Sequence, residues 1–220
     1  MYSSNMFMHS RFLHSDKINL KYQFLLRYLN VMGENEITLF RTLGLMKRLE
    51  RDLAVLYSVI AEGVHDAIIS SIMRKIGIES ATHSYILALI EPLIRECPPR
   101  RITDTEYLIS IQNNIEEALN HVHEIIDFVN SRVKVGGEEV GAFLVEKLNE
   151  LEDFESNATK VYSFLLRSYL PITSTRVDTK RRATSKLIVK LLKGIADDER
   201  EHGELLMVVN ELLGREGVKK

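Results

Sequence analysis

The feature of this sequence that most constrains its fold is an internal repeat of polar residues set in apolar, helix-like segments. The stretch LERDLAVLYSVI (49–60) aligns with FESNATKVYSFL (154–165), and IGIESATHSYIL (76–87) aligns with IADDEREHGELL (195–206). Each copy carries a glutamate and a tyrosine seven residues apart, and further along an acid and a histidine four residues apart. This repeat indicates that one helical hairpin occurs twice in the chain.

Apolar residues recur at helical spacing along almost the whole chain after residue 35. The four prolines fall near the ends of these periodic stretches, which leaves long runs in which helices are stable. One segment shows a single apolar stripe: Leu108, Ile111, Ile115, Leu119, Val122, Ile126 and Val129. The spacing predicts helices at 36–62, 66–96, 104–131, 138–170 and 184–213. We therefore predict an all-α fold, a four-helix up-and-down bundle with an extra helix in its long crossover.

The first 33 residues differ from the rest, because they carry four basic residues against a single acid, Asp16. We expect them to form an extension that is weakly structured or contains a short helix. The helical bundle itself is expected to span 34–216. Its parts are a first hairpin, an inserted helix and a second hairpin, at 36–96, 104–131 and 138–213.

Composition narrows the classes of partner. The formal net charge of −2 gives no reason to expect binding to nucleic acid or to an anionic membrane. The longest apolar run, SYILALI (84–90), is far shorter than the ~20 residues that a membrane span needs. A single cysteine, Cys97, excludes an intramolecular disulfide and any paired CxxC metal site. We therefore expect a cytoplasmic protein without nucleic-acid or membrane partners.

The polar residues of the repeat are predicted to converge. At about 1.5 Å of rise per residue, five of them fall at a similar level, halfway along the bundle. These are Glu50, His83, Glu155, Glu199 and His202. Each alone has an ordinary explanation, as an acid on a solvated helix face or as a hydrogen-bonded core histidine, and only the joint pattern favours a shared site.

A buried set of carboxylates and imidazoles must be neutralised, because an ionised group without a partner costs several kcal/mol. A divalent metal achieves this, and carboxylate oxygen and imidazole nitrogen suit iron, manganese and zinc. One glutamate on each of two helices, with Glu-x-x-His on the other two, is the ligand pattern of the di-iron and di-manganese carboxylate bundles. Residues 199–202 fit that motif, so the sequence predicts a metal site.

On these residues the chain resembles the ferritin-like superfamily, and within it the rubrerythrin-like branch of di-iron carboxylate bundles, over about 36–213. The resemblance implies that Glu50 and Glu155 are terminal carboxylate ligands. It implies that Glu199 bridges two metals and that His83 and His202 are the terminal imidazole ligands.

The resemblance also places Tyr57 and Tyr162 beside the ligands, where a phenol can hold a ligand carboxylate in position.

Ser80 departs from the family pattern, which has a second bridging glutamate at this position. Glu79 is adjacent but flanks the ligand face, and Glu152 lies one turn before Glu155 and is the other candidate to supply the missing oxygen. With three clear carboxylates and two histidines, we predict about one tightly held metal per chain and weak or no turnover of peroxide.

The resemblance implies oxygen, peroxide or iron redox chemistry. The expected metal is iron, as a single ion or a di-iron centre, with manganese or zinc as the alternative. It does not assign catalytic residues. Rubrerythrins carry a rubredoxin-type iron domain, which this sequence lacks, so a peroxidase or ferroxidase would need an external electron donor. We expect a homodimer. The other hypotheses are a metal-free bundle that serves as a binding or scaffold module, and a monooxygenase with a substrate pocket between its helices.

Overall fold

The computed structural model describes residues 34–99, 105–133, 138–169 and 178–217, so the predicted extension at 1–33 lies outside the described part of the chain. Five helices and no strand occur in the described residues, which confirms the all-α class. The helices are α2 (Glu34–Gly63), α3 (Ala67–Glu96), α4 (Thr105–Val133), α5 (Glu138–Tyr169) and α6 (Thr179–Gly217).

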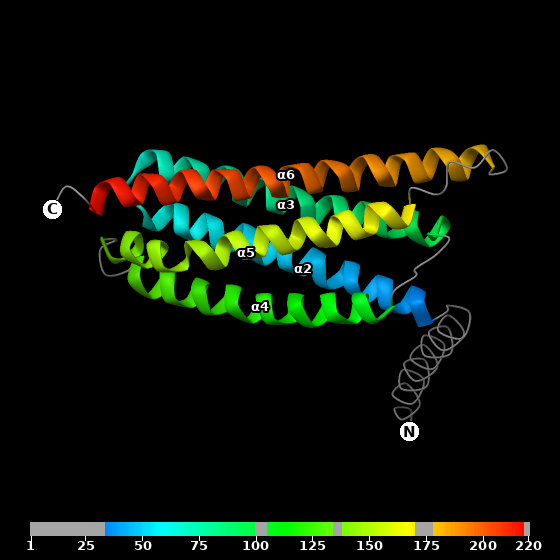
Figure 1. Cartoon of the computed structure of the whole chain (residues 1–220), viewed down its shortest axis with the longest axis horizontal. Coiled ribbons are helices and arrows are strands. Elements are labelled where there is room, and N and C mark those ends of the chain that lie inside the picture. Colours follow the sequence, from blue (N-terminus) through cyan, green and yellow to red (C-terminus); the bar gives the residue numbers. More distant parts are fainter. Residues whose placement is uncertain (1–33, 100–104, 134–137, 170–177, 218–220) are drawn as a thin grey trace, which may run out of the picture.

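The five helices lie side by side along the long axis of the molecule (Figure 1). Two hairpins, α2–α3 and α5–α6, form the main contacts, and α3 of the first hairpin packs against α6 of the second. The crossover helix α4 packs along α2 and more lightly on α5. No helix in the described part of the chain is both long and apolar enough to cross a membrane.

Aspartates begin the second helix of each hairpin. The Asp66 carboxylate accepts hydrogen bonds from the backbone N–H groups of Ile68 and Ile69, each at 2.8 Å. The Asp178 carboxylate accepts one from the N–H of Lys180 at 3.1 Å. Such caps satisfy backbone donors that have no partner within the helix. Because Asp178 supplies this cap, α6 begins five residues earlier than the predicted start at 184.

The apolar stripe predicted for the crossover helix is buried almost as expected. Its buried residues are Leu108, Ile111, Ile115, Leu119, Val122, Ile125 and Val129. The prediction was wrong at one position, because Ile125 faces the core and Ile126 is half-buried. Steps of three or four residues average close to one helical turn, which keeps the stripe on one face against α2 and α5.

Helices α2 and α3 approach closely at Gly77. A Cβ atom at this position would lie 3.2 Å from the carbonyl oxygen of Ala54 and 3.3 Å from Cβ of Tyr57. The aligned position in the second hairpin is Ala196, which is also small and buried. Small residues here let the paired helices pack tightly, and this brings the polar residues of neighbouring turns close to one another.

Candidate metal centre

The structure brings together all five residues of the predicted site. They are Glu50 on α2, His83 on α3, Glu155 on α5, and Glu199 and His202 on α6, and none is more than 2% exposed. They form two groups that share Glu199: Glu50, His83 and Glu199 in one, and Glu155, Glu199 and His202 in the other. Within each group one potential ligand atom from every residue lies within 4.8 Å of the others.

Glu199 lies between the two histidines. Nδ1 of His83 is 2.7 Å from Glu199 Oε1 and 3.5 Å from Glu50 Oε2. On the other side, Nδ1 of His202 is 3.3 Å from Glu155 Oε2 and 3.9 Å from Glu199 Oε2. The two imidazole rings are stacked, with their centroids 5.7 Å apart. Both Nδ1 atoms therefore face the carboxylates in the interior of the bundle.

The outer nitrogen of each imidazole contacts a carboxylate from the opposite hairpin. Nε2 of His83 is 3.1 Å from Asp198 Oδ2, and Nε2 of His202 is 3.0 Å from Glu79 Oε2. An ionised carboxylate can only accept, so Nε2 carries the hydrogen of each contact and Nδ1 can present its lone pair inward when the ring is neutral. This arrangement orients a metal-binding histidine.

Sequence reasoning placed Glu79 beside the ligand face and assigned no role to Asp198. The structure places both at the outer edge of the cluster. The available signal was the alignment of the two acids at equivalent positions of the repeat.

The two buried tyrosines also cross between hairpins. The Tyr57 hydroxyl donates a short hydrogen bond to Glu155, and the Tyr162 hydroxyl donates one to Glu50. Burial, and then the nearby carboxylates, raise the pKa of each phenol well above its usual value. Both phenols therefore stay protonated, and each holds one carboxylate of the cluster in a fixed orientation.

The cluster holds protons when it has no metal. Burial, followed by repulsion from Glu50 and Glu155, raises the pKa of the Glu199 carboxyl well above its usual value. Burial alone would lower the pKa of His83 and His202, but nearby carboxylates, those of Glu50 and Asp198 for His83 and those of Glu155 and Glu79 for His202, outweigh it and raise both pKa values. For Glu155, burial is outweighed by the hydrogen bond from His202, so its pKa is lowered. Protons on Glu199 and the imidazoles thus reduce the charge that the site must bury.

Several buried ligand-type atoms have no hydrogen-bond partner. These are Glu50 Oε2, His83 Nδ1 and both carboxylate oxygens of Glu199. His83 Nδ1 and Glu199 Oε1 are 2.7 Å apart, but they are not aligned as a hydrogen bond, so both atoms count as unpartnered. Buried polar atoms normally have partners, and a divalent cation satisfies oxygen and nitrogen lone pairs together. The residues present fit iron, manganese or zinc.

Ser80 is buried at the position that aligns with Glu199, and its Oγ has no hydrogen-bond partner. Glu79 does not fill the place of the missing carboxylate, because its carboxylate contacts the outer side of His202 and pairs with Lys75 at 2.6 Å. The two groups therefore contain three carboxylates and two imidazoles in all.

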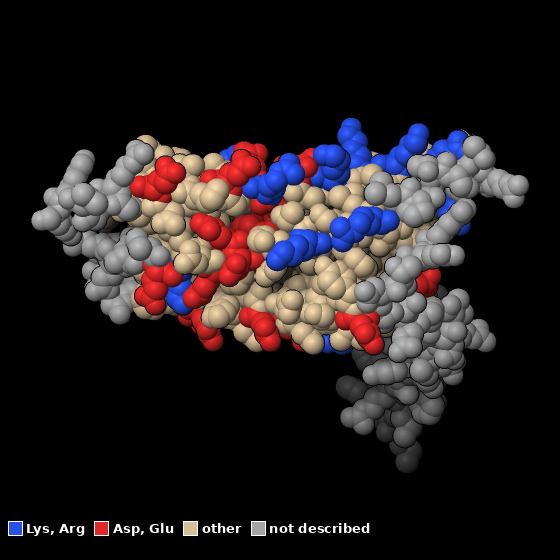
Figure 2. Space-filling model, viewed as in Figure 1, with Lys and Arg blue, Asp and Glu red and all other residues tan. Residues whose placement is uncertain are grey.

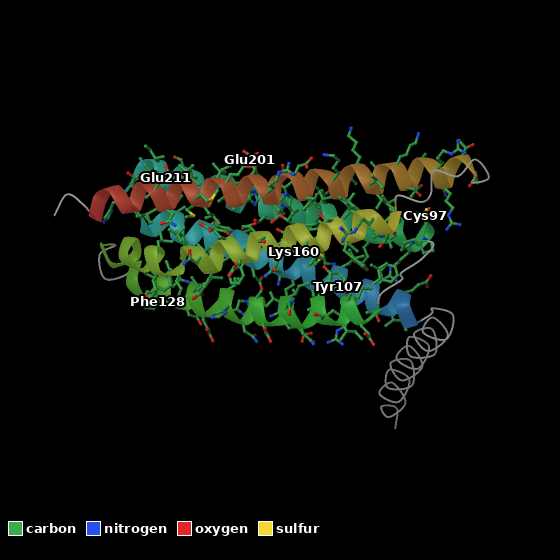
Figure 3. The ribbon with its side chains drawn as sticks, viewed as in Figure 1. Cys97, Tyr107, Phe128, Lys160, Glu201 and Glu211 are labelled. Carbon is green, nitrogen blue, oxygen red and sulfur yellow. The ribbon has the colours of Figure 1, made fainter. Side chains whose placement is uncertain are left out.

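The surface beside the cluster is acidic. Figure 2 shows acidic side chains gathered over the middle of the bundle between α5 and α6, with basic side chains toward one end. A shallow groove on α6 is lined by four acids, Asp197, Asp198, Glu201 and Glu204, together with Arg200, Leu205 and Val208, and Figure 3 labels Glu201 on this helix. Asp198 is part of this surface and also contacts the buried His83. An acidic surface raises the local concentration of cations.

Comparisons with known protein families, curated proteins and solved structures found no match to this chain.

Proposed function

We propose that this protein is a ferritin-like, rubrerythrin-like metal-binding protein that acts on oxygen, peroxide or iron. The observation that carries the proposal is the pair of buried carboxylate–imidazole groups that share Glu199. Burying several ionisable groups together is costly unless a cation or protons neutralise them, so such an arrangement is uncommon without a role for the buried groups. The internal repeat supports the proposal, since both hairpins contribute equivalent residues.

In this proposal Glu50 and His83 bind metal on one side of the cluster, and Glu155 and His202 bind metal on the other side. Glu199 is a ligand on both sides. Each imidazole binds through Nδ1, because Nε2 is held by a carboxylate of the opposite hairpin. The tyrosine hydroxyls keep the two outer glutamates in place. The protein thus supplies fixed ligands and a site that is almost fully shielded from water.

Bound iron or manganese would supply one-electron redox chemistry toward oxygen or peroxide, which the side chains alone cannot perform. Zinc also binds carboxylate oxygen and imidazole nitrogen, but it has no redox chemistry of its own. Cys97 is the only cysteine in the sequence, so a four-cysteine iron site cannot be formed here to deliver electrons. Repeated turnover would therefore draw electrons from an external donor.

Metal analysis of protein purified without chelator tests the binding step, followed by anaerobic titration with Fe(II). Exposure to oxygen should then produce a near-ultraviolet charge-transfer band. The Glu199→Ala/His202→Ala double variant should lose both the metal and the band, whereas Glu211→Ala, which removes an exposed acid of the same helix outside the acidic groove, should keep both. Equal metal content in the parent and the double variant would show that the ligands lie elsewhere.

Ser80 favours one alternative, in which the site has decayed and the bundle acts as a metal-free binding or scaffold module. Ser80 has a short neutral hydroxyl without a hydrogen-bond partner, whereas the aligned residue of the second hairpin, Glu199, has a carboxylate. In that case the parent protein would bind Fe(II) no more tightly than the double variant does.

A further inference from the structure

A separate cavity of about 210 Å³ lies between α2, α5 and the crossover helix α4. Its walls are mainly apolar and include Met46, Leu49, Ile111, Ile115, Phe154 and Val161. All six side chains are buried and belong to the apolar core, and Ile111 and Ile115 are part of the stripe of α4. An interior lined by apolar side chains favours a hydrocarbon group over water.

The cavity changes character from its inner end to its mouth. Glu50, which is 2% exposed, lies in the lining and connects the cavity with the cluster described above. Exposed polar side chains, those of Asn114, Asn157 and Lys160, lie at the other end. Lys160 Nζ donates a hydrogen bond to Asn157 Oδ1 at 3.1 Å. Figure 3 shows Lys160 on α5 and Tyr107 on α4, two of the three helices that line the cavity.

Charge fixes the orientation of an occupant. Among the described residues that line the cavity, Lys160 is the one cation and Glu50 is the one anion. A negatively charged head group is attracted to the mouth and repelled from the inner end, while an uncharged chain meets apolar side chains along the way. Ammonium and amide groups at the mouth are hydrogen-bond donors that suit a carboxylate.

We propose that this cavity binds a small amphipathic monocarboxylate, with its chain inside and its carboxylate at Lys160. An apolar protein cavity of roughly 150 Å³ holds a benzene molecule. The cavity here is larger and accommodates a chain of about eight carbons, whose end lies beside Glu50. The proposal does not require a bound metal, because Glu50 is the one described lining residue that belongs to the cluster, and the carboxylate is bound at the other end, at Lys160.

Octanoate is the probe, and octanol and octylamine are its matched controls in calorimetric titration of the full chain. Octanoate should bind about two- to fivefold more tightly than octylamine, which is the preference expected of a charge pair at an exposed mouth. Lys160→Met should weaken the binding of octanoate by the same factor and leave the affinity for octanol unchanged. Lys190→Met, which removes an exposed lysine of α6 outside the lining, should change neither. Octylamine binding as tightly as octanoate would overturn the proposal.

Two variants that fill the cavity from different helices test its location. Ala158→Phe on α5 and Ala118→Phe on α4 should each weaken octanoate by more than about tenfold, because a buried ring takes the space of the chain. Circular dichroism and thermal unfolding identify which variants remain folded. A folded variant that binds octanoate as the parent does would overturn the proposal.

The same titrations with chelator-treated and Fe(II)-supplemented protein separate this inference from the proposed function. Octanoate affinity should be the same in both samples. Binding that occurs only with metal would make octanoate a ligand of the cluster, and would overturn the assignment to the cavity. Failure of the chain to bind any metal would leave the expected octanoate affinity unchanged.

Discussion

Replacing Ser80 with glutamate should convert a site for one tightly held metal into a site for two. Ser80 is 1% exposed and lies three residues before His83, as Glu199 lies three residues before His202. The substitution places a fourth carboxylate on the same helix face as the histidine. Two dications carry four positive charges, and the three carboxylates of the parent site supply only three negative charges. The added glutamate supplies the fourth.

The electrostatic gain is large. Two opposite unit charges about 4 Å apart attract by about 4 kcal/mol at an effective dielectric constant of about 20. That energy corresponds to roughly a thousandfold change in Kd, from which the cost of burying the new carboxylate must be subtracted. We therefore expect the second metal to bind about 100-fold more tightly in the Ser80→Glu variant. Without metal the same variant should be less stable than the parent, because the added carboxylate lies among like charges.

Anaerobic Fe(II) titration, with metal content measured after desalting, gives the stoichiometry. Ser80→Gln is the matched control for size, since it adds a similar side chain without the charge, and Ser71→Glu adds a carboxylate on an exposed face of the same helix. Both controls should retain about one metal. Two tight metals in the parent would refute the reasoning about Ser80, and a single metal in Ser80→Glu would show that this side of the bundle is not a ligand face.

Three further predictions follow from the same cluster. In the absence of metal, the Glu199→Ala/His202→Ala variant should be at least as stable as the parent in thermal unfolding, because it no longer buries those polar groups. Tyr57→Phe and Tyr162→Phe should each weaken metal binding by about 10- to 100-fold in competition titrations, since each removes the donor that orients a ligand carboxylate. The pKa values of Glu199, His83 and His202 are raised above the ordinary 4.5 and 6.5, so the folded state keeps protons that the unfolded state releases. The chelator-treated parent should therefore lose stability in urea as pH rises from roughly 5 to 8, and the double variant should lose less.

The fold and the convergence of the polar residues followed from local patterns. Helical spacing located all five described helices, and the rise per residue placed Glu50 and Glu199 at one level although they lie on different hairpins. The cap at Asp178 was missed because it stands within a basic, polar stretch whose periodicity is weak. The choice between Ile125 and Ile126 was missed because both adjacent residues are isoleucines, and only the packing of α4 decides which one faces the core.

The contacts around the cluster were harder to predict because they cross between the two copies of the repeat. The Tyr57 hydroxyl donates to Glu155 and the Tyr162 hydroxyl donates to Glu50, so each of these hydrogen bonds joins the two hairpins.

The acids adjacent to Ser80 and Glu199 follow the same rule. Glu79 contacts the histidine of the second hairpin, and Asp198 contacts the histidine of the first. Each histidine is therefore held by an acid of the other hairpin, although Glu155, Glu199 and His202 all belong to the second hairpin. The substitution of serine for glutamate at position 80 has consequences for both groups of ligand residues. Glu199 is shared by the two groups, so with Ser80 in place of a second shared carboxylate, two dications would have to divide the charge of a single bridging side chain.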